Sequence, residues 1–171
     1  MTLSVPPETD VLVTADCWRA AADVEVVVMR AIAAAAAAVP VETGDAELAV
    51  MLTDDEGIRT LNRNWRGIDK PTNVLSFPAL QPERKQPDDM PRMLGDIAIA
   101  FQTTQREAET DEKSFDHHLS HLAIHGFLHL VGYDHVTDGG AEEMESLERD
   151  ILKGLGIPDP YADEHWTLRD G

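Results

Sequence analysis

Apolar and polar residues follow two different periods along this chain, and the period distinguishes strands from helices. Alternating or short apolar runs predict strands over residues 11–14, 47–52, 73–77 and 96–101. Apolar residues repeated at helical spacing predict helices over residues 18–39, 53–65, 102–112, 116–131 and 141–155. Because short connections join strands and helices, the pattern predicts an α/β or α+β domain with helices packed on one small sheet.

The second predicted helix carries signals at both ends. Thr53 followed three residues later by Glu56 is typical of a capping box, which opens a helix, and Gly67 is expected to end it. Ile58, Leu61 and Trp65 are expected on its inner face.

The length of 171 residues suits one core rather than two, so we expect a single domain over residues 1–171. We expect residues 1–10 to be flexible. Residues 81–91 combine three prolines with many charged side chains, which predicts an exposed loop.

No membrane-spanning or secretory segment is predicted. Residues 1–10 lack the basic start and apolar run of a signal peptide, and the most apolar stretch, residues 24–41, is interrupted by Glu25 and Arg30. We therefore expect a cytoplasmic protein without a membrane partner.

The net charge of -18 would repel nucleic acid if it were spread evenly. Residues 57–87, however, contain six Lys and Arg against two acidic residues, so this segment carries +4 and the remainder -22. The segment is either a local basic patch on an acidic protein or an ordinary fluctuation among solvated charges. Composition alone leaves both open.

A run of histidines carries the clearest chemical signal. His125 and His129 stand four apart on a predicted helix, so both imidazoles can reach one ion. Gly132 permits the turn that would carry His135 to a third position. Since Cys17 is the only cysteine, any metal must be held by His, Asp or Glu.

This is the ligand spacing of the metzincin proteases, with Gly126 in place of their catalytic glutamate. Three neutral nitrogen donors fit Zn²⁺ best, although iron, nickel or copper are not excluded by ligand softness. We expect one zinc per chain, with the fourth position open to water. The alternative is that these are ordinary structural histidines, but the occurrence of three histidines at this spacing disfavours it.

Two neighbours of the trio have open roles. His121 lies one helical turn before His125 and could face substrate, support the site, act as a fourth ligand or be purely structural. Asp134 could orient an imidazole or cap the turn.

Arg59, Arg63 and Arg66 recur at helical spacing, with Lys70 just beyond. Guanidinium groups bind phosphate oxygens in a bidentate manner and can neutralise charge on a transferring phosphoryl group. The stripe therefore suits RNA, but it also fits the ordinary exposed face of a helix.

Three motifs resemble the YbeY family of bacterial metal-dependent endoribonucleases. They are His125-Gly-Phe-Leu-His-Leu-Val-Gly-Tyr-Asp-His135, Trp65-Arg-Gly-Ile-Asp-Lys-Pro-Thr-Asn-Val-Leu-Ser-Phe-Pro78 and Leu94-Gly-Asp-Ile-Ala-Ile99. The motifs lie across most of the chain after residue 45. Trp65 stands where the family has tyrosine or phenylalanine.

The resemblance implies an α+β fold with a mixed sheet, about five helices and a cleft at the metal. It implies zinc on His125, His129 and His135, and Arg66 as the arginine required for activity. Substrate contacts are expected from Arg59, Arg63, Lys70 and His121.

The implied function is cleavage of single-stranded RNA in maturation of the 3′ end of small-subunit (16S) rRNA and in ribosome quality control. The implied partners are rRNA and the small ribosomal subunit, with ribosomal proteins or other nucleases as candidate accessories. The alternatives are a metzincin-like metallopeptidase and a non-catalytic ribosome-assembly factor with structural zinc.

Overall fold

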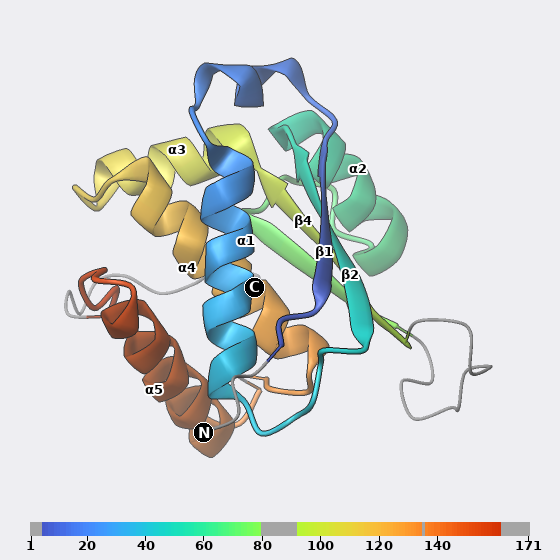
Figure 1. Ribbon diagram of the computed structural model, residues 1–171. Helices are drawn as coiled ribbons and strands as arrows, with labels where there is room; N and C mark the ends of the chain where they lie inside the picture. Colours follow the sequence, from blue (N-terminus) through green and yellow to red (C-terminus); the bar gives the residue numbers. More distant parts are fainter. Residues whose placement is uncertain (1–4, 80–91, 135, 162–171) are drawn as a thin grey trace.

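The computed structural model describes residues 5–79, 92–134 and 136–161. These residues form four strands, five α-helices and one 3-10 helix (Figure 1). In chain order the elements are β1 (Glu8–Val13), η1 (Asp16–Ala20), α1 (Val24–Ala38), β2 (Ala46–Thr53), α2 (Asp55–Arg66), β3 (Val74–Pro78), β4 (Arg92–Ala100), α3 (Phe101–Thr110), α4 (Phe115–Leu130) and α5 (Asp138–Gly154). The expected loop over residues 81–91 lies outside the described residues.

The strands form one mixed sheet in the order β1-β2-β4-β3. β2 pairs in parallel with both β1 and β4, whereas β3 pairs with β4 in the antiparallel direction. Val50 of β2 lies opposite Val11 on one side and Ile97 on the other. The expected α+β class with a mixed sheet is confirmed.

Alternation along the strands gives the sheet two covered faces of unequal size. One face packs against α1 and α4 and forms the larger core, in which Leu48, Val50 and Ile97 are fully enclosed. On the other face α2 contributes Ile58, which packs with Leu75 of β3. Since α5 contacts α1 and α4, helix α4 is enclosed on most sides.

Helix α4 approaches the sheet most closely at Gly126. A Cβ atom on this residue would lie 2.9 Å from Cγ2 of Ile97, closer than real carbon contacts allow. The missing side chain therefore lets α4 lie directly on β4. Ser76 of β3 fixes the same point, because its hydroxyl donates to the Gly126 carbonyl at 3.2 Å.

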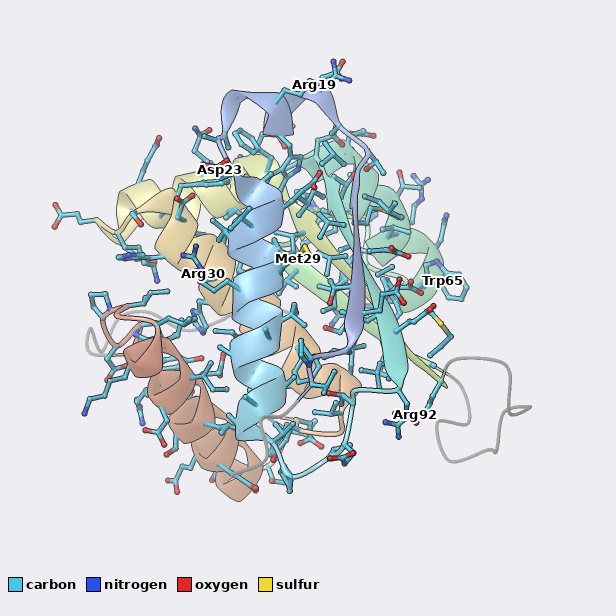
Figure 2. The ribbon with its side chains drawn as sticks, viewed as in Figure 1. Arg19, Asp23, Met29, Arg30, Trp65 and Arg92 are labelled. Carbon is cyan, nitrogen blue, oxygen red and sulfur yellow. The ribbon has the colours of Figure 1, made fainter. Side chains whose placement is uncertain are left out.

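The expectation of one long helix over residues 18–39 is wrong in its first part. Asp23 has a left-handed backbone (φ 57°) at the residue before α1, and this conformation interrupts the helix (Figure 2 labels Asp23). The chain before it forms η1 instead. There the buried Trp18 donates from Nε1 to the Thr53 carbonyl at 2.6 Å, a tertiary contact that local periodicity does not predict.

Within the segment expected to be flexible, residues 8–10 belong to β1 and pair with residues 47–49. Residues 1–4 lie outside the described chain. The residue that caps α2 is Asp54 rather than the expected Thr53. The Asp54 carboxylate accepts from the Gly57 N–H at 2.8 Å, and Thr53 is the last residue of β2.

The C-terminal end of α2 is partly as expected. Gly67 ends the helix with φ 73°, as its position predicts. Trp65, expected on the inner face, is instead 72% exposed (Figure 2 labels Trp65). Its ring contacts Phe77 edge to face.

Candidate metal centre and adjoining cleft

His125 and His129 occupy the last two turns of α4, and their imidazoles converge. The two Nε2 atoms lie 3.0 Å apart, with ring centroids separated by 4.6 Å and ring planes at 79°. His125 is almost fully buried, whereas His129 is partly exposed. The pair therefore presents two nitrogen atoms at the border between core and solvent.

This geometry fits a bound metal ion. Two zinc–nitrogen bonds of about 2.0–2.1 Å at a tetrahedral angle place their nitrogens roughly 3.3 Å apart, close to the observed separation. When no ion is bound, the same 3.0 Å separation suits an N–H···N hydrogen bond between the two rings, because a neutral imidazole has one donor and one acceptor nitrogen. The geometry of His125 and His129 therefore suits two ligands of one ion.

The hydrogen bond made by Nδ1 of His125 determines which ring nitrogen holds the lone pair. Nδ1 lies 3.1 Å from Oε1 of Glu148, a residue of α5 with no exposed surface. An ionised carboxylate only accepts hydrogen bonds, so Nδ1 carries the proton and donates. In the neutral ring Nε2 then holds the lone pair, and Nε2 is the atom that faces His129.

Glu148 accepts from two further donors. Nε2 of His121 lies 2.8 Å from Oε1, and the Tyr161 hydroxyl donates to Oε2 at 3.0 Å. Burial by itself would raise the pKa of Glu148, but the facing His121 and His125 imidazoles hold it well below its ordinary value. The carboxylate is therefore ionised while enclosed in the core.

His121 is 1% exposed, and its Nε2 faces Glu148. Burial lowers the pKa of His121, which favours the neutral ring. His121 thus contacts the same carboxylate that accepts from His125. His121 is not among the residues that line the cleft containing His129.

The turn after α4 begins as the sequence predicts. Gly132 has φ 105°, a conformation that favours glycine. His135 lies outside the described residues, and no group of three His, Cys, Asp or Glu side chains gathers as metal ligands within the described ranges. Asp134 is exposed and accepts from the Val136 N–H at 3.1 Å, so it caps the turn.

A cleft of about 360 Å³ adjoins the histidine pair. Arg66, at the end of α2, lines it together with His129. Its remaining lining residues come from β3 and the turn after α4: Leu75, Ser76, Pro78, Gly132, Tyr133 and Asp134. The cleft thus brings the guanidinium group of Arg66 and the imidazole of His129 to one open space.

The other basic residues of the stripe are not part of that lining. Arg59 forms a two-point ion pair with Asp69, with Nε 2.9 Å from Oδ1, and Arg63 lies 4.0 Å from the same oxygen. Lys70 is exposed, and its carbonyl accepts from the buried Asn62 side chain. The structure therefore separates Arg66 from Arg59, Arg63 and Lys70.

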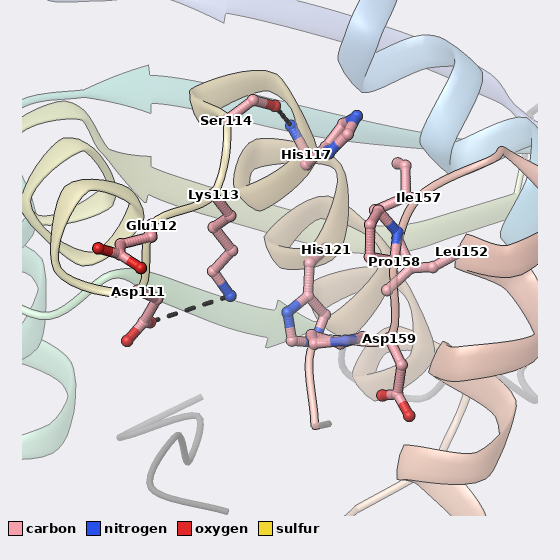
Figure 3. Close-up of a pocket in the computed structure, with 11 residues that line it drawn as sticks. Asp111, Glu112, Lys113, Ser114, His117, His121, Leu152, Ile157, Pro158 and Asp159 are labelled. Carbon is pink, nitrogen blue, oxygen red and sulfur yellow. Dashed lines mark hydrogen bonds and ion pairs between the residues drawn. The ribbon is translucent and has the colours of Figure 1, made fainter. Parts of the chain in front are cut away.

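A second cavity, of about 380 Å³, lies on the other side of His121, between the start of α4 and residues 157–160 (Figure 3). Lys113 enters it but pairs with Asp111 at 3.9 Å. Because Glu112 and Asp159 also line it, this cavity is unsuited to an anion.

Glu148 is the residue of the site that periodicity missed, although a signal for it exists. Met144, Ile151 and Leu152 form the buried stripe of α5, and Glu148 lies on the same stripe at helical spacing. A charged residue on an apolar stripe implies a buried partner.

The fold and the site together define an α+β protein with a pair of converging histidines beside a cleft that contains an arginine. The family model described as Endoribonuclease YbeY matches residues 15–156. The chain belongs to the YbeY family of endoribonucleases.

Relatives cover nearly the whole chain. The Endoribonuclease YbeY of Rhodopseudomonas palustris (strain BisB18) is 71% identical over 164 residues, which is 96% of this chain and 98% of that protein. The Endoribonuclease YbeY of Nitrobacter winogradskyi is 72% identical over 163 residues, 95% of this chain and 86% of that protein. The solution structure of TM1509 from Thermotoga maritima aligns with a TM-score of 0.49 at 22% identity, over 93% of this chain and 99% of that one.

Proposed function

We propose that this chain is a zinc-dependent endoribonuclease that cleaves single-stranded RNA. One zinc ion per chain would be held by His125, His129 and His135. The observation that carries the proposal is the shared cleft: His129, whose Nε2 converges with that of His125, lines the same space as Arg66.

The zinc ion and the basic residues would have different roles in cleavage. Zinc bound there would supply a Lewis acid that polarises a phosphate oxygen and activates water. Arg66 would bind a nonbridging phosphate oxygen and stabilise the charge that develops during cleavage. Arg59, Arg63 and Lys70 would at most guide the RNA strand towards the cleft, because Asp69 already engages the first two.

The proposed biological substrate is the 3′ region of small-subunit (16S) rRNA, and the proposed setting is ribosome maturation and quality control in the cytoplasm. Family membership supports this assignment. Ribosomal proteins or other nucleases are the candidate accessory partners. No helix in the described ranges combines the length and apolarity needed to cross a bilayer.

The two alternatives are less well supported. A metallopeptidase would need a glutamate at position 126, where any side chain would collide with Ile97 on the sheet side of α4. A structural zinc site would need a fourth protein ligand, and the Nε2 atom of His121 is already committed to Glu148.

The deciding experiment compares purified wild-type protein with His129→Ala for zinc content and for cleavage of a labelled single-stranded RNA. We expect about one zinc per chain in the wild type, and loss of most zinc and most cleavage in the variant. Full zinc retention by His129→Ala would refute the site. Casein cleavage by zinc-loaded wild type would revive the peptidase alternative.

A further inference from the structure

Glu148 stands apart from the proposed ligands, yet among the described Asp, Glu, Lys and Arg residues it is the most completely buried. Its side chain has no exposed surface and lies on the buried stripe of α5. Burying a lone carboxylate is strongly unfavourable, so its presence requires partners that repay desolvation. Those partners are two residues of α4 and one from the chain that follows α5.

The contacts are arranged asymmetrically on the two carboxylate oxygens. Oε1 accepts from both His121 and His125, at 2.8 and 3.1 Å, whereas Oε2 accepts from Tyr161 at 3.0 Å. Three donors on one carboxylate leave it little freedom to rotate. The position of the acceptor for His125 is therefore fixed by groups outside the candidate metal site.

Tyr161 is itself held in place. Its N–H donates to Asp159 at 2.8 Å, and the guanidinium carbon of Arg149 lies 5.3 Å from the centre of its ring. Arg149 also pairs with Asp159 at 3.3 Å. The segment after α5 thus returns to α5 and presents a hydroxyl to Glu148.

We propose that Glu148 is a positioning residue for the metal centre, and that Tyr161 in turn positions Glu148. Through Nδ1 of His125 the carboxylate selects the tautomer whose Nε2 lone pair faces His129, and it fixes the orientation of the ring. This inference rests on the proposed zinc site and extends it to residues that touch neither metal nor RNA.

The expected effect falls on metal affinity. Removing a group that orients a ligating histidine typically weakens metal binding by about 10- to 100-fold. In Glu148→Gln the side chain keeps its shape but loses the charge that strengthens its hydrogen bond to His125. Tyr161→Phe removes the donor to Oε2 and a 3.3 Å contact with Nε2 of His121 but leaves the hydrogen bond between Glu148 and His125, so it should weaken binding less, by a few-fold.

The chain offers a matched control on the same helix. His118 is fully buried, and its Nε2 lies 2.8 Å from Oε1 of Glu107, a carboxylate of α3. This pair repeats the histidine–carboxylate contact without a ligand position. Glu107→Gln therefore makes the same chemical change away from the metal centre.

The experiment measures the zinc dissociation constant by competition with a chelator in wild type, Glu148→Gln, Tyr161→Phe, Glu107→Gln and His129→Ala. Long-range ¹H–¹⁵N spectra of the zinc-free wild type and Glu148→Gln report the tautomer of His125. We expect weaker zinc binding in Glu148→Gln, a smaller loss in Tyr161→Phe and wild-type affinity in Glu107→Gln. The preference of His125 for the Nδ1–H tautomer should be weaker in Glu148→Gln than in the wild type, because a neutral amide oxygen is a weaker acceptor than a carboxylate.

The outcomes separate this inference from the site on which it rests. Wild-type affinity in Glu148→Gln, together with loss of zinc in His129→Ala, would overturn the positioning role and leave the zinc site intact. Zinc retention in His129→Ala would overturn both. If Glu148→Gln does not fold, Tyr161→Phe decides, and unchanged affinity there overturns the proposal.

Discussion

Arg66 and His129 line one cleft, although Arg66 ends α2 on one face of the sheet and His129 belongs to α4 on the other. The two elements meet around β3, which supplies Leu75 and Ser76 to the same lining. Under the proposed function, a phosphate bound in this space would contact the guanidinium group of Arg66 and lie beside His129.

The first prediction is that Arg66→Ala loses about 100- to 1,000-fold of RNA cleavage, because removing a group that stabilises transition-state charge has this scale of effect. Zinc content and melting temperature should stay near wild type, since the side chain is exposed. The measurements are single-turnover cleavage of single-stranded RNA, zinc analysis and thermal unfolding. A collapsed melting temperature would make Arg66 structural instead.

Arg63→Ala is the matched control for Arg66. Arg63 lies on the same helix, is 53% exposed and forms a 4.0 Å ion pair with Asp69. Exposed pairs of this kind contribute about 0–1 kcal/mol. Cleavage should fall far less than in Arg66→Ala; an equal loss would show a general electrostatic effect rather than a role for the cleft.

A second prediction concerns the contact between α4 and β4. Gly126→Ala places a methyl group 2.9 Å from Cγ2 of Ile97, and such overpacking costs about 1–3 kcal/mol, more than the roughly 1 kcal/mol that alanine gains in a helix. Urea denaturation should therefore show a less stable protein.

The effect of Gly126→Ala on the free energy of unfolding should change sign once Ile97 is truncated. Ile97→Ala alone should cost about 2–5 kcal/mol, but in that background Gly126→Ala should stabilise, because the clash is gone and the helix preference remains. A full double-mutant cycle measures this coupling. Equal costs of Gly126→Ala in both backgrounds would contradict the close approach.

Two tryptophans give a third prediction. Trp18→Phe removes the buried donor to the Thr53 carbonyl and leaves unfilled space, so it should cost about 1–3 kcal/mol. Trp65→Phe changes a ring that is 72% exposed and should cost about 0.5 kcal/mol or less. Both values come from chemical denaturation, and similar costs would mean that η1 is not anchored by Trp18.

The fourth prediction is a pH dependence located at His118 and Glu107. Burial lowers the pKa of His118; burial alone would raise the pKa of Glu107, but His118 and Asn73 lower it. Both folded pKa values lie below the unfolded ones, so the unfolded state binds more protons as pH falls. Stability is therefore lost on acidification, beginning near the ordinary histidine pKa of about 6.5.

The variant His118→Gln isolates this effect. Its free energy of unfolding should fall less steeply than that of the wild type between pH 7 and 5, when both are measured in excess zinc by urea denaturation. The difference in slope cannot exceed about 1.4 kcal/mol per pH unit for one proton. Identical slopes would contradict proton linkage at His118.

Local sequence predicted the parts of the molecule that depend on neighbours along the chain. The spacing of His125 and His129 on one helix face, the left-handed turn at Gly132 and the helix stop at Gly67 all follow from helix geometry or glycine conformation. The strand positions follow from alternation, because one face of each strand must be buried.

The remaining features depend on contacts between distant segments. Trp18 lies in η1 rather than in α1 because its indole donates to Thr53 of β2. The left-handed backbone of Asp23 separates η1 from α1. Glu148 meets His125 only when α5 packs on α4. Periodicity marks a residue as buried or exposed, but it does not say which helix lies opposite.

The position of Glu148 late in the chain has a consequence for the order in which the protein matures. Synthesis proceeds from the N-terminus, so the sheet and α4 leave the ribosome before α5 and Tyr161 do. Until then His125 lacks the carboxylate that selects its tautomer. The arrangement of the histidine pair that we propose to bind zinc is therefore among the last features that a newly made chain acquires.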